Sequence, residues 1–310
     1  MPAIMTHYQF GISTLAKRGA GSFPTRAERD AFLLGNQGPD PFFFVVRTPS
    51  FRDIGSFGRF LHNEHVDASI EAMIACAQSA KGIERLVLDA YISGYLCHFS
   101  LDSATHPYVI SLTHALCAAG VPGLDERDDR YVHSQIESDI DAYMLWRHLG
   151  KTVADLSITR YALQGNNKLL GYVDGLFFPM ISELYDLSLP GNLYTRGIHD
   201  MRMAYNIIQS PSGRKRVLIG MLERALPKRR HSFLQALSHR NDVYDDGAII
   251  NLEREPWMDI FTGEQRVESF IDLFDAASDA AVVRINAFLD GQADTHTLTG
   301  GKDFSGNLQW

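Results

Sequence analysis

The sequence predicts an all-α fold, and three observations favour that class. Apolar residues recur at helical spacing in nearly every long segment, for example at Val66, Ile70, Met73, Ile74 and Ala77. No segment shows the apolar–polar alternation of a strand ladder. Hydrophobic residues make up 45% of the 310-residue chain, which is ample for a buried core. We therefore expect a globular protein built from many helices.

Besides the segment at 66–77, four long segments carry this helical periodicity. The first is expected over residues 83–102, where one apolar stripe ends in His98 and Asp102. Pro107 disfavours helical geometry at the residue before it, so we expect this helix to end near His106, where the backbone turns. The remaining three helices are expected at residues 131–149, 169–185 and 267–288.

Turn-forming residues separate these segments without a long flexible linker. They lie at residues 35–41, 120–123, 190–191, 211–213 and 245–247. The domains that we predict are a helical domain over residues 1–189, a helical extension packed on it over 190–290, and a loose tail over 291–310 that is rich in Gly, Thr and Asp.

The composition favours an ordinary globular protein in a reducing compartment. The formal net charge of -8 argues against a stable nucleic-acid partner. Cys76, Cys97 and Cys117 form no CxxC pair, and we interpret them as core thiols. The first twenty residues lack a signal-peptide pattern, and the longest strongly apolar run, residues 42–46, is far shorter than the ~20 residues of a membrane span. We therefore expect a cytoplasmic protein without a transmembrane segment.

Two features resemble membrane-binding elements but are interpreted as ordinary parts of a globular protein. The three phenylalanines at 42–44 are interpreted as core residues rather than as a membrane-inserting loop. The basic stretches at 214–216 and 228–230 are interpreted as solvated helix faces, although they are compatible with transient contact with a membrane surface. The sequence gives no indication of the oligomeric state.

Two histidine–carboxylate pairs are the strongest chemical signal. His98 and Asp102 are four residues apart, as are His133 and Glu137, so each pair lies on one face of a helix. A lone histidine on an apolar face is usually a hydrogen-bonded core residue, but a buried carboxylate such as Asp102 needs a cation. Imidazole and carboxylate donors without a thiolate cluster indicate zinc. The sequence therefore predicts a zinc site between two helices.

Other residues are weaker candidates for the same site. His106 follows Asp102 where the chain is expected to turn, within reach of a neighbouring ion. Asp40 is equally consistent with a turn residue after Pro39, and His7 with a surface residue. His62 and His65 are three residues apart on an expected helix, so either or both face inward, and His62 is favoured.

The remaining carboxylates and histidines near these motifs are not assigned to the site. Asp139 and Asp141 are placed on the outer face of their helix. Five histidines have no comparable partner and are interpreted as structural or exposed: His148, His199, His231, His239 and His296.

The order of the candidates resembles the zinc-dependent phospholipase C family, whose all-helical fold is shared with the S1/P1-type nucleases. The residues that carry the resemblance are His7, Asp40, His62, HFSLD at 98–102, His106 and HSQIE at 133–137. It covers roughly residues 1–185 and implies a phospholipase C/P1 nuclease-like fold, here with additional C-terminal helices, and two or three zinc ions in one cleft. The implied ligands are Asp40, His62, His98 and Asp102 for one zinc, His106, His133 and Glu137 for a second, and His7 with the far oxygen of Asp102 for a third.

We therefore expect a zinc-dependent hydrolase of phosphoric esters. The resemblance implies a phospholipase C-like phosphodiesterase whose substrate is a phosphodiester or phospholipid, attacked by a zinc-activated hydroxide. Asp40 is the candidate catalytic residue, because its carboxylate could orient or deprotonate that water. The alternatives are an S1/P1-like nuclease or nucleotidase and a non-catalytic zinc-binding helical domain. Seven or more candidate ligands favour a multi-ion catalytic cleft over a closed structural site with four ligands.

Overall fold

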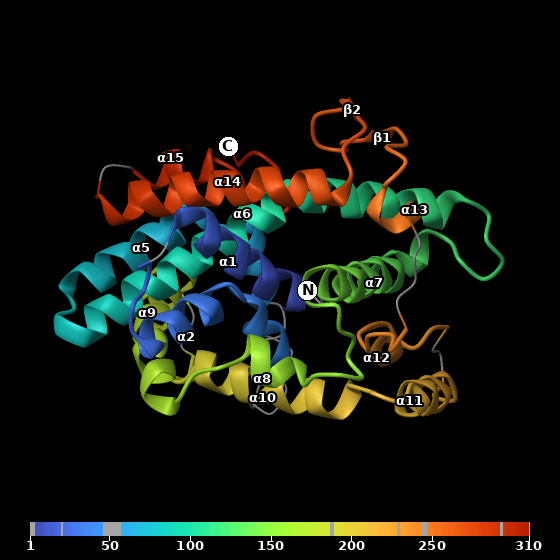
Figure 1. Ribbon diagram of the computed structural model, residues 1–310, viewed down its shortest axis with the longest axis horizontal. Helices are drawn as coiled ribbons and strands as arrows, with labels where there is room; N and C mark the ends of the chain where they lie inside the picture. The colour runs from blue at the N-terminus through green and yellow to red at the C-terminus, as the bar shows by residue number, and fades with distance from the viewer. Residues whose placement is uncertain are drawn as a thin grey trace.

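The computed structural model describes residues 4–19, 21–45, 57–186, 189–227, 230–242, 247–291 and 294–309. Within these ranges the regular structure is helical apart from one two-stranded antiparallel hairpin, so the predicted all-α class is confirmed (Figure 1). The longer helices are α1 (Ile4–Arg18), α2 (Arg26–Gly35), α5 (Val66–Ser79), α6 (Gly82–Ala118), α7 (Asp129–Leu149), α9 (Asn167–Tyr185), α10 (Leu193–Ile208), α11 (Arg214–Arg224) and α14 (Phe270–Leu289). The shorter elements are η1 (Asp40–Phe44), α4 (Phe57–Asn63), η2 (Glu126–Asp128), α8 (Ile158–Ala162), α12 (Phe233–Ala236), α13 (Gly247–Ile250), α15 (Thr295–Thr299), and strands β1 (Trp257–Met258) and β2 (Gln265–Arg266).

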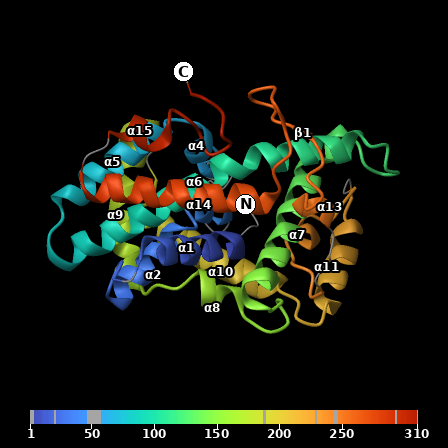
Figure 2. The ribbon, with the colours of Figure 1, turned by 45° about the horizontal axis from the view of Figure 1, so that its top comes forward.

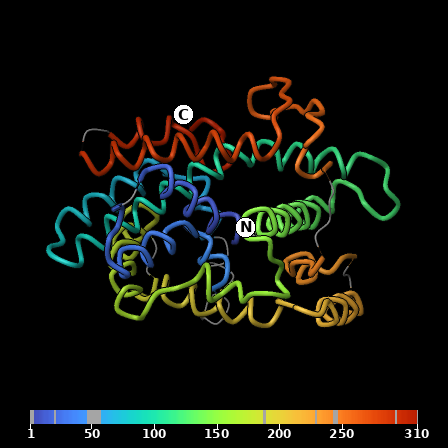
Figure 3. Tube along the Cα trace, viewed as in Figure 1, coloured from blue at the N-terminus to red at the C-terminus, as the bar shows by residue number. Residues whose placement is uncertain are grey.

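Helix α6 runs through the middle of the molecule. Helices α1, α2, α7 and α14 pack against it, and Figures 1 and 2 show α14 running alongside it. Every residue from 91 to 103 is buried, so this stretch has neighbours on all sides, as expected for a central helix. Figure 3 shows that the described chain begins close to α7, with which α1 is in contact. Residues from both ends of the chain therefore meet around one helix.

Helix α6 does not end near His106, so that prediction is wrong. It continues through Pro107 as one helix to Ala118. Pro107 lacks the N–H that would bond the carbonyl of Ser103. The backbone of Gly306 packs on this turn so closely that a Cβ there would lie 2.5 Å from the oxygen of Ser103. Tertiary packing thus outweighs the local preference, and His106 stays on the helix one turn after the predicted ligand pair.

The other predicted helices are confirmed within three residues at each end. Helices α7, α9 and α14 correspond to the predictions at 131–149, 169–185 and 267–288. Burial also confirms the core assignment of Phe42 and Phe44, and of Cys97 and Cys117, whereas Cys76 is half-buried. Residues 228 and 229 of the basic stretch, and 245 and 246 of the last predicted turn, lie outside the described residues.

Helices α2 and α6 cross at a pair of glycines. A Cβ on Gly35 would lie 2.1 Å from the carbonyl oxygen of Tyr91, and one on Gly94 would lie 2.0 Å from that of Phe32. Side-chain carbons do not approach carbonyl oxygens this closely, so the crossing requires glycine at both positions. The chain that leaves α2 towards Asp40 therefore starts at a fixed place on α6.

The C-terminal segment is packed, not loose, so the predicted tail is wrong for residues 294–309. Helix α15 contacts α5, and beyond it Lys302 and Leu308 form an isolated antiparallel bridge. Phe304, between them, is completely buried. Composition does not reveal a single buried anchor of this kind. The predicted boundaries near residues 189 and 290 stay predictions, although α14 contributes to the core by packing on α1 and α6.

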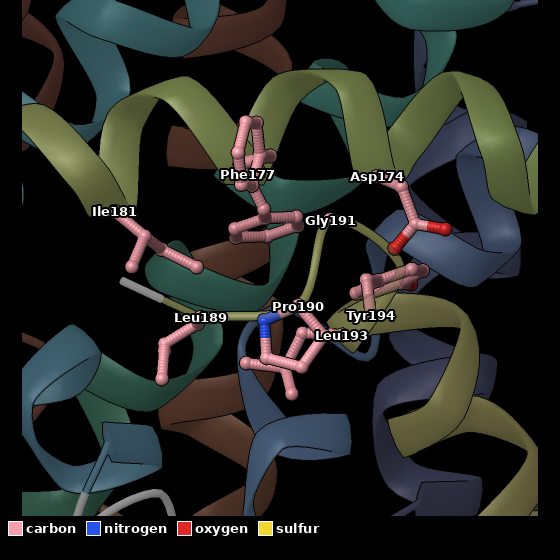
Figure 4. A pocket seen from close by; sticks show the side chains of 9 residues that line it. Asp174, Phe177, Ile181, Leu189, Pro190, Gly191, Leu193 and Tyr194 are labelled. Carbon is pink, nitrogen blue, oxygen red and sulfur yellow. The ribbon is translucent and has the colours of Figure 1, made fainter. Parts of the chain in front are cut away.

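The junction between α9 and α10 leaves almost no free space. Figure 4 shows Asp174 on α9 directed towards the start of α10 beside Tyr194. Its carboxylate accepts hydrogen bonds from the backbone N–H of Thr195, at 3.1 Å, and from the Thr195 hydroxyl. The adjoining cavity, lined by Phe177 and Leu193, has a volume of about 10 Å³, which is enough for about one water molecule. This junction is therefore a packing feature rather than a ligand site.

The glycine crossing gives a stability prediction. We expect Gly94→Ala to lower the free energy of unfolding by about 1–3 kcal/mol, because the added methyl group overlaps the α2 backbone. Denaturant unfolding of the purified protein measures this. Gly171→Ala on α9 is the matched control: a Cβ there has nothing within 4 Å, so we expect a gain of about 0.5–1 kcal/mol. Equal effects of the two substitutions would contradict the requirement for glycine at the crossing.

Candidate metal centre

Eight side chains from five elements converge on one region beside α6. They are His7 on α1, Asp40 at the start of η1, His62 on α4, His98, Asp102 and His106 on α6, and His133 and Glu137 on α7. The structure thus brings together all eight candidates from the sequence. Their assignment as metal ligands stays a prediction, and it depends on the geometry described next.

Asp102 is the meeting point of four histidines. Its Oδ1 lies 3.2 Å from Nε2 of His7, and its Oδ2 lies 3.1 Å from Nε2 of His98. Oδ2 also lies 3.8 Å from Nδ1 of His106 and 3.9 Å from Nε2 of His62. Burial raises the pKa of Asp102, but His98, His106 and His7 lower it more strongly, so the pKa is well below its usual value. Asp102 is therefore an ionised carboxylate that can bridge two cations.

Asp40 lies on the other side of the same group and is 1% exposed. Its Oδ1 is 3.2 Å from Nε2 of His62, but neither carboxylate oxygen accepts a well-aligned hydrogen bond from a described residue. Burial raises its pKa, whereas His62 and His98 are among the groups that lower it, and the net shift is downwards. A buried anion whose two oxygens lack hydrogen-bond donors is costly without a cation.

A second group of donors lies between α6 and α7. Oε1 of Glu137 is 3.4 Å from Nε2 of His106 and 3.2 Å from Nε2 of His133. Burial lowers the pKa of His106, but Asp102 and Glu137 outweigh it and raise the pKa to about 9. Burial raises the pKa of Glu137, but His133 and His106 help to hold it well below its usual value. The side chain of His133 is 27% exposed, so this side of the centre is the more open one.

The donor atoms fit divalent metal ions. Three sets each have one donor atom per residue within 4.8 Å of the others: His7 with Asp40 and His98, His62 with His98 and Asp102, and His106 with His133 and Glu137. The donors are imidazole nitrogens and carboxylate oxygens, the combination that suits zinc. Nδ1 of His7 and Nε2 of His98 are also buried without a hydrogen-bond partner among the described residues. Cations would satisfy these atoms together with the oxygens of Asp40.

Backbone carbonyls orient three of the histidines. The Nδ1 atoms lie 2.6 Å from the carbonyl oxygen of Gly58 for His62, 3.1 Å from that of Asn36 for His98, and 2.8 Å from that of Phe304 for His106. A hydrogen bond of this kind places the proton on Nδ1 and leaves Nε2 free to bind a metal ion. The sequence did not reveal these partners, because a backbone carbonyl is present at every residue.

Comparison of the sequence with models of protein families assigns the chain to a family. A family model of zinc-dependent phospholipase C matches residues 6–187, which is more than half of the sequence. The chain belongs to the zinc-dependent phospholipase C family. This membership supports a zinc-dependent hydrolase of phosphoesters, and the histidine and carboxylate clusters fit zinc binding. No curated protein and no solved structure matches the sequence. Among the described helices, none combines the length and apolar character needed to cross a bilayer.

Phe304 reaches the centre from beyond the part that matches the zinc-dependent phospholipase C family. Its backbone N–H donates to the carbonyl of His62 at 3.1 Å. Its ring centroid lies 5.0 Å from that of His62 and 5.5 Å from that of His98. Since its carbonyl also accepts from Nδ1 of His106, one C-terminal residue contacts histidines of both donor groups.

Asp141 is buried, so its assignment to the outer helix face is wrong. Its carboxylate accepts hydrogen bonds from the backbone N–H groups of Met5 at 3.1 Å and Thr6 at 2.5 Å, and Nε2 of His239 lies 2.5 Å away. A carboxylate at this position satisfies free N–H groups and the positive end of the α1 dipole. Asp141 follows Glu137 by four residues, so helical spacing alone predicts that both lie on the same face of α7.

The remaining predicted residues lie outside the centre. His65 is exposed, adopts a left-handed conformation with φ 54° at the start of α5 and packs against Tyr185, so His62 is the histidine that faces inward. Asp139 is partly exposed and lies 3.1 Å from Arg240. The structural histidines have local partners: His148 packs on Phe274, His231 lies 3.3 Å from Asp128, and His296 lies 3.0 Å from Asp67.

Removing His98 tests the metal centre directly. His98 belongs to two of the three donor sets, so His98→Ala is expected to lower the zinc content per chain and to abolish turnover. Elemental mass spectrometry of purified protein measures the zinc. His65→Ala is the control, because His65 is exposed and outside the centre. Unchanged zinc in the His98 variant would reject the site.

Phe304 provides a separate test of the C-terminal contact. Because the ring is completely buried, Phe304→Ala is expected to reduce the free energy of unfolding by about 3–5 kcal/mol and to weaken zinc retention under mild chelation. Phe178→Ala on α9, where the ring is 50% exposed, should change stability by less than about 1 kcal/mol and leave zinc retention unchanged. A panel of unrelated core variants shows how much zinc is lost for a given loss of stability. If Phe304→Ala loses no more zinc than equally destabilised variants of this panel, a local role of Phe304 is contradicted.

Proposed function

We propose that this chain hydrolyses a phosphodiester of the phospholipid type with two or three zinc ions as cofactors. The proposed ligands are His7, Asp40, His62, His98, Asp102, His106, His133 and Glu137. Their convergence from five elements is the observation that carries the proposal. Family membership supports the reaction class, phosphoester hydrolysis, and the finer assignment to a phosphodiester is ours.

The charge of the site itself requires cations for this reaction. Asp40, Asp102 and Glu137 are buried, and their pKa values are all shifted downwards, so three ionised carboxylates lie close together, while the raised pKa of His106 supplies one opposing positive charge. An anionic phosphodiester would be repelled from such a site. Metal ions held by the same carboxylates reverse the sign of the local charge and so make a phosphate ligand acceptable.

Asp40 is the proposed catalytic base. Its ionised carboxylate is buried, and one of its oxygens would remain available to accept a proton from water while the other holds a metal ion. Zinc, when bound, supplies Lewis acidity and lowers the pKa of the water that it holds. The rings of Phe43 and Phe304, with centroids 5.1 Å and 5.0 Å from that of His62, keep bulk water away from this side. Exclusion of water strengthens the electrostatic interactions inside the centre.

The substrate is proposed to approach from the side of α6 and α7. His106 and His133 have the most exposed side chains of the eight, at 14% and 27%. The fully buried His98 lies deepest. A phosphodiester that enters there meets the His106, His133 and Glu137 group first, and the carboxylate of Asp102 connects this group to the inner ligands.

Kinetics with Asp40→Asn test the proposed base. The substitution removes the proton acceptor while keeping the side-chain shape, so kcat for a chromogenic phosphodiester should fall by about 10²–10⁴-fold. Asp275→Asn is the control: Asp275 is exposed on α14, away from the cluster, and its loss should leave kcat unchanged. Because Asp40 is also a proposed zinc ligand, elemental analysis measures the zinc in both variants, and kcat is expressed per bound zinc. Equal kcat values at equal zinc content would contradict a catalytic role of Asp40.

A substrate panel for the zinc-loaded protein tests the phosphodiester assignment against the alternatives. Short-chain phosphatidylcholine is expected to release phosphocholine, and removal of zinc by a chelator should abolish this activity, with recovery when zinc is returned. Turnover of single-stranded DNA or of nucleotides alone would overturn the phospholipid assignment in favour of a nuclease or nucleotidase. Full zinc loading with no turnover of any substrate in the panel would favour the non-catalytic zinc-binding domain.

A further inference from the structure

A groove separate from the metal centre lies between α6, α14, the β1–β2 hairpin and the C-terminal segment. Its volume is about 520 Å³, within the range of pockets that hold small ligands. None of the eight proposed zinc ligands lines it. Its floor includes Ser103 and Pro107, each one residue beyond a candidate ligand on α6, and its edge includes Lys302 and Leu308 of the C-terminal segment.

Arg284 on α14 carries a charge into this groove without a carboxylate partner. Its Nε donates to the carbonyl of Leu298 at 2.6 Å, and its Nη1 to the hydroxyl of Ser100 at 3.3 Å. No described carboxylate forms an ion pair with it, and burial lowers its pKa without an opposing negative charge. Guanidinium groups that are partly desolvated usually pair with an anion. The Phe99 ring lies 5.6 Å from the guanidinium carbon, but no described carboxylate takes the position of the anion.

The rest of the groove also has a positive balance of charge. Lys302 is exposed and forms no ion pair with a described residue. Arg266 on β2 lies 2.9 Å from Glu268 and 3.5 Å from Asp259, and Asp259 is the one carboxylate in the lining. Three cationic side chains and one carboxylate give the lining a formal charge of +2, on a chain whose net charge is -8. Such a local reversal of sign favours an anionic ligand.

The α14 wall of the groove and its rim also carry apolar side chains. Leu273, Ala276 and Ala280 of α14 line the wall, together with Phe261 of the hairpin loop. The hairpin projects from the body of the molecule beyond α14 (Figures 1 and 2). Large exposed apolar side chains lie on or beside it and on the C-terminal segment: Met258, Ile260, Val267 and Leu308 are 41–50% exposed. Exposed apolar groups gathered beside a cationic groove are unusual on a free surface.

We propose that this groove binds an amphiphile that carries one phosphate group. The phosphate contacts Arg284 and Lys302, since guanidinium and ammonium groups form charge-assisted hydrogen bonds to phosphate oxygens. The hydrocarbon part lies along Ala276, Ala280 and Leu308. Because the groove contains none of the proposed zinc ligands, the proposal does not depend on the proposed hydrolysis.

Calorimetric titration of the zinc-loaded full-length protein with dihexanoyl phosphatidic acid tests the groove. Arg284→Gln and Lys302→Gln are each expected to weaken binding about tenfold, whereas Arg284→Lys should retain part of it. Ala276→Phe places a ring against the exposed apolar wall and should also remove binding. Lys302 and Ala276 are exposed, so these two variants keep the test valid if Arg284→Gln fails to fold.

Three controls distinguish binding in the groove from binding elsewhere on the protein. Arg214→Gln removes an equal charge from α11, where Arg214 is exposed and lines a different pocket, and should leave binding unchanged. His98→Ala should also retain the groove component, which distinguishes it from phosphate bound at the metal centre. Inorganic phosphate is expected to bind more weakly than the lipid. Equal affinities in the wild type and all groove variants would overturn the proposal, and equally tight binding of inorganic phosphate would overturn the amphiphile assignment.

Discussion

The buried carboxylate of Asp102 is the constraint on which the rest of the structure depends. It is 6% exposed and has four histidines within 3.9 Å. A charge in that position needs positive partners, and the histidines that surround it come from α1, α4 and α6. Three separate helices must therefore pack so that their histidines reach the two carboxylate oxygens of Asp102. The cap that Asp141 forms on α1 holds the start of that helix, and the glycine crossing of α2 on α6 fixes the start of the chain that leads to Asp40. The packing of the fold therefore also positions the candidate metal ligands.

The C-terminal segment extends this constraint beyond the region that matches the family. Phe304 donates its N–H to the carbonyl of His62 and accepts from Nδ1 of His106, so its backbone links α4 to α6. Gly306, two residues later, packs on the turn of α6 where Pro107 leaves the carbonyl of Ser103 without its helical partner. The C-terminal segment therefore packs on the part of α6 where the proline interrupts the helical hydrogen bonds. A helix that ended at His106 would have removed the surface on which this segment lies.

Sequence spacing predicted most of the centre and missed what supports it. The pairs His98–Asp102 and His133–Glu137 were recognisable because helical geometry fixes the relation between residues four apart. The same spacing places Asp141 on the face of Glu137. In the sequence, however, Asp141 resembles a solvent-exposed acidic residue of a polar helix, and only the packing of α1 against it shows that it is buried. Pro107 was misleading because its effect on the chain depends on tertiary contacts. The contacts of Phe304 are long-range and involve backbone atoms, so no local pattern encodes them.

The C-terminal segment lies between two environments of opposite charge. On one side, three ionised carboxylates require cations before a phosphate can approach. On the other side, Arg284 and Lys302 provide positive charge from the chain itself. Phe304 faces the first side, while Lys302 and Leu308, which pair with each other, line the second. The Lys302–Leu308 bridge and the Phe304 carbonyl that orients His106 belong to one short, hydrogen-bonded loop, so a single stretch of backbone borders both environments.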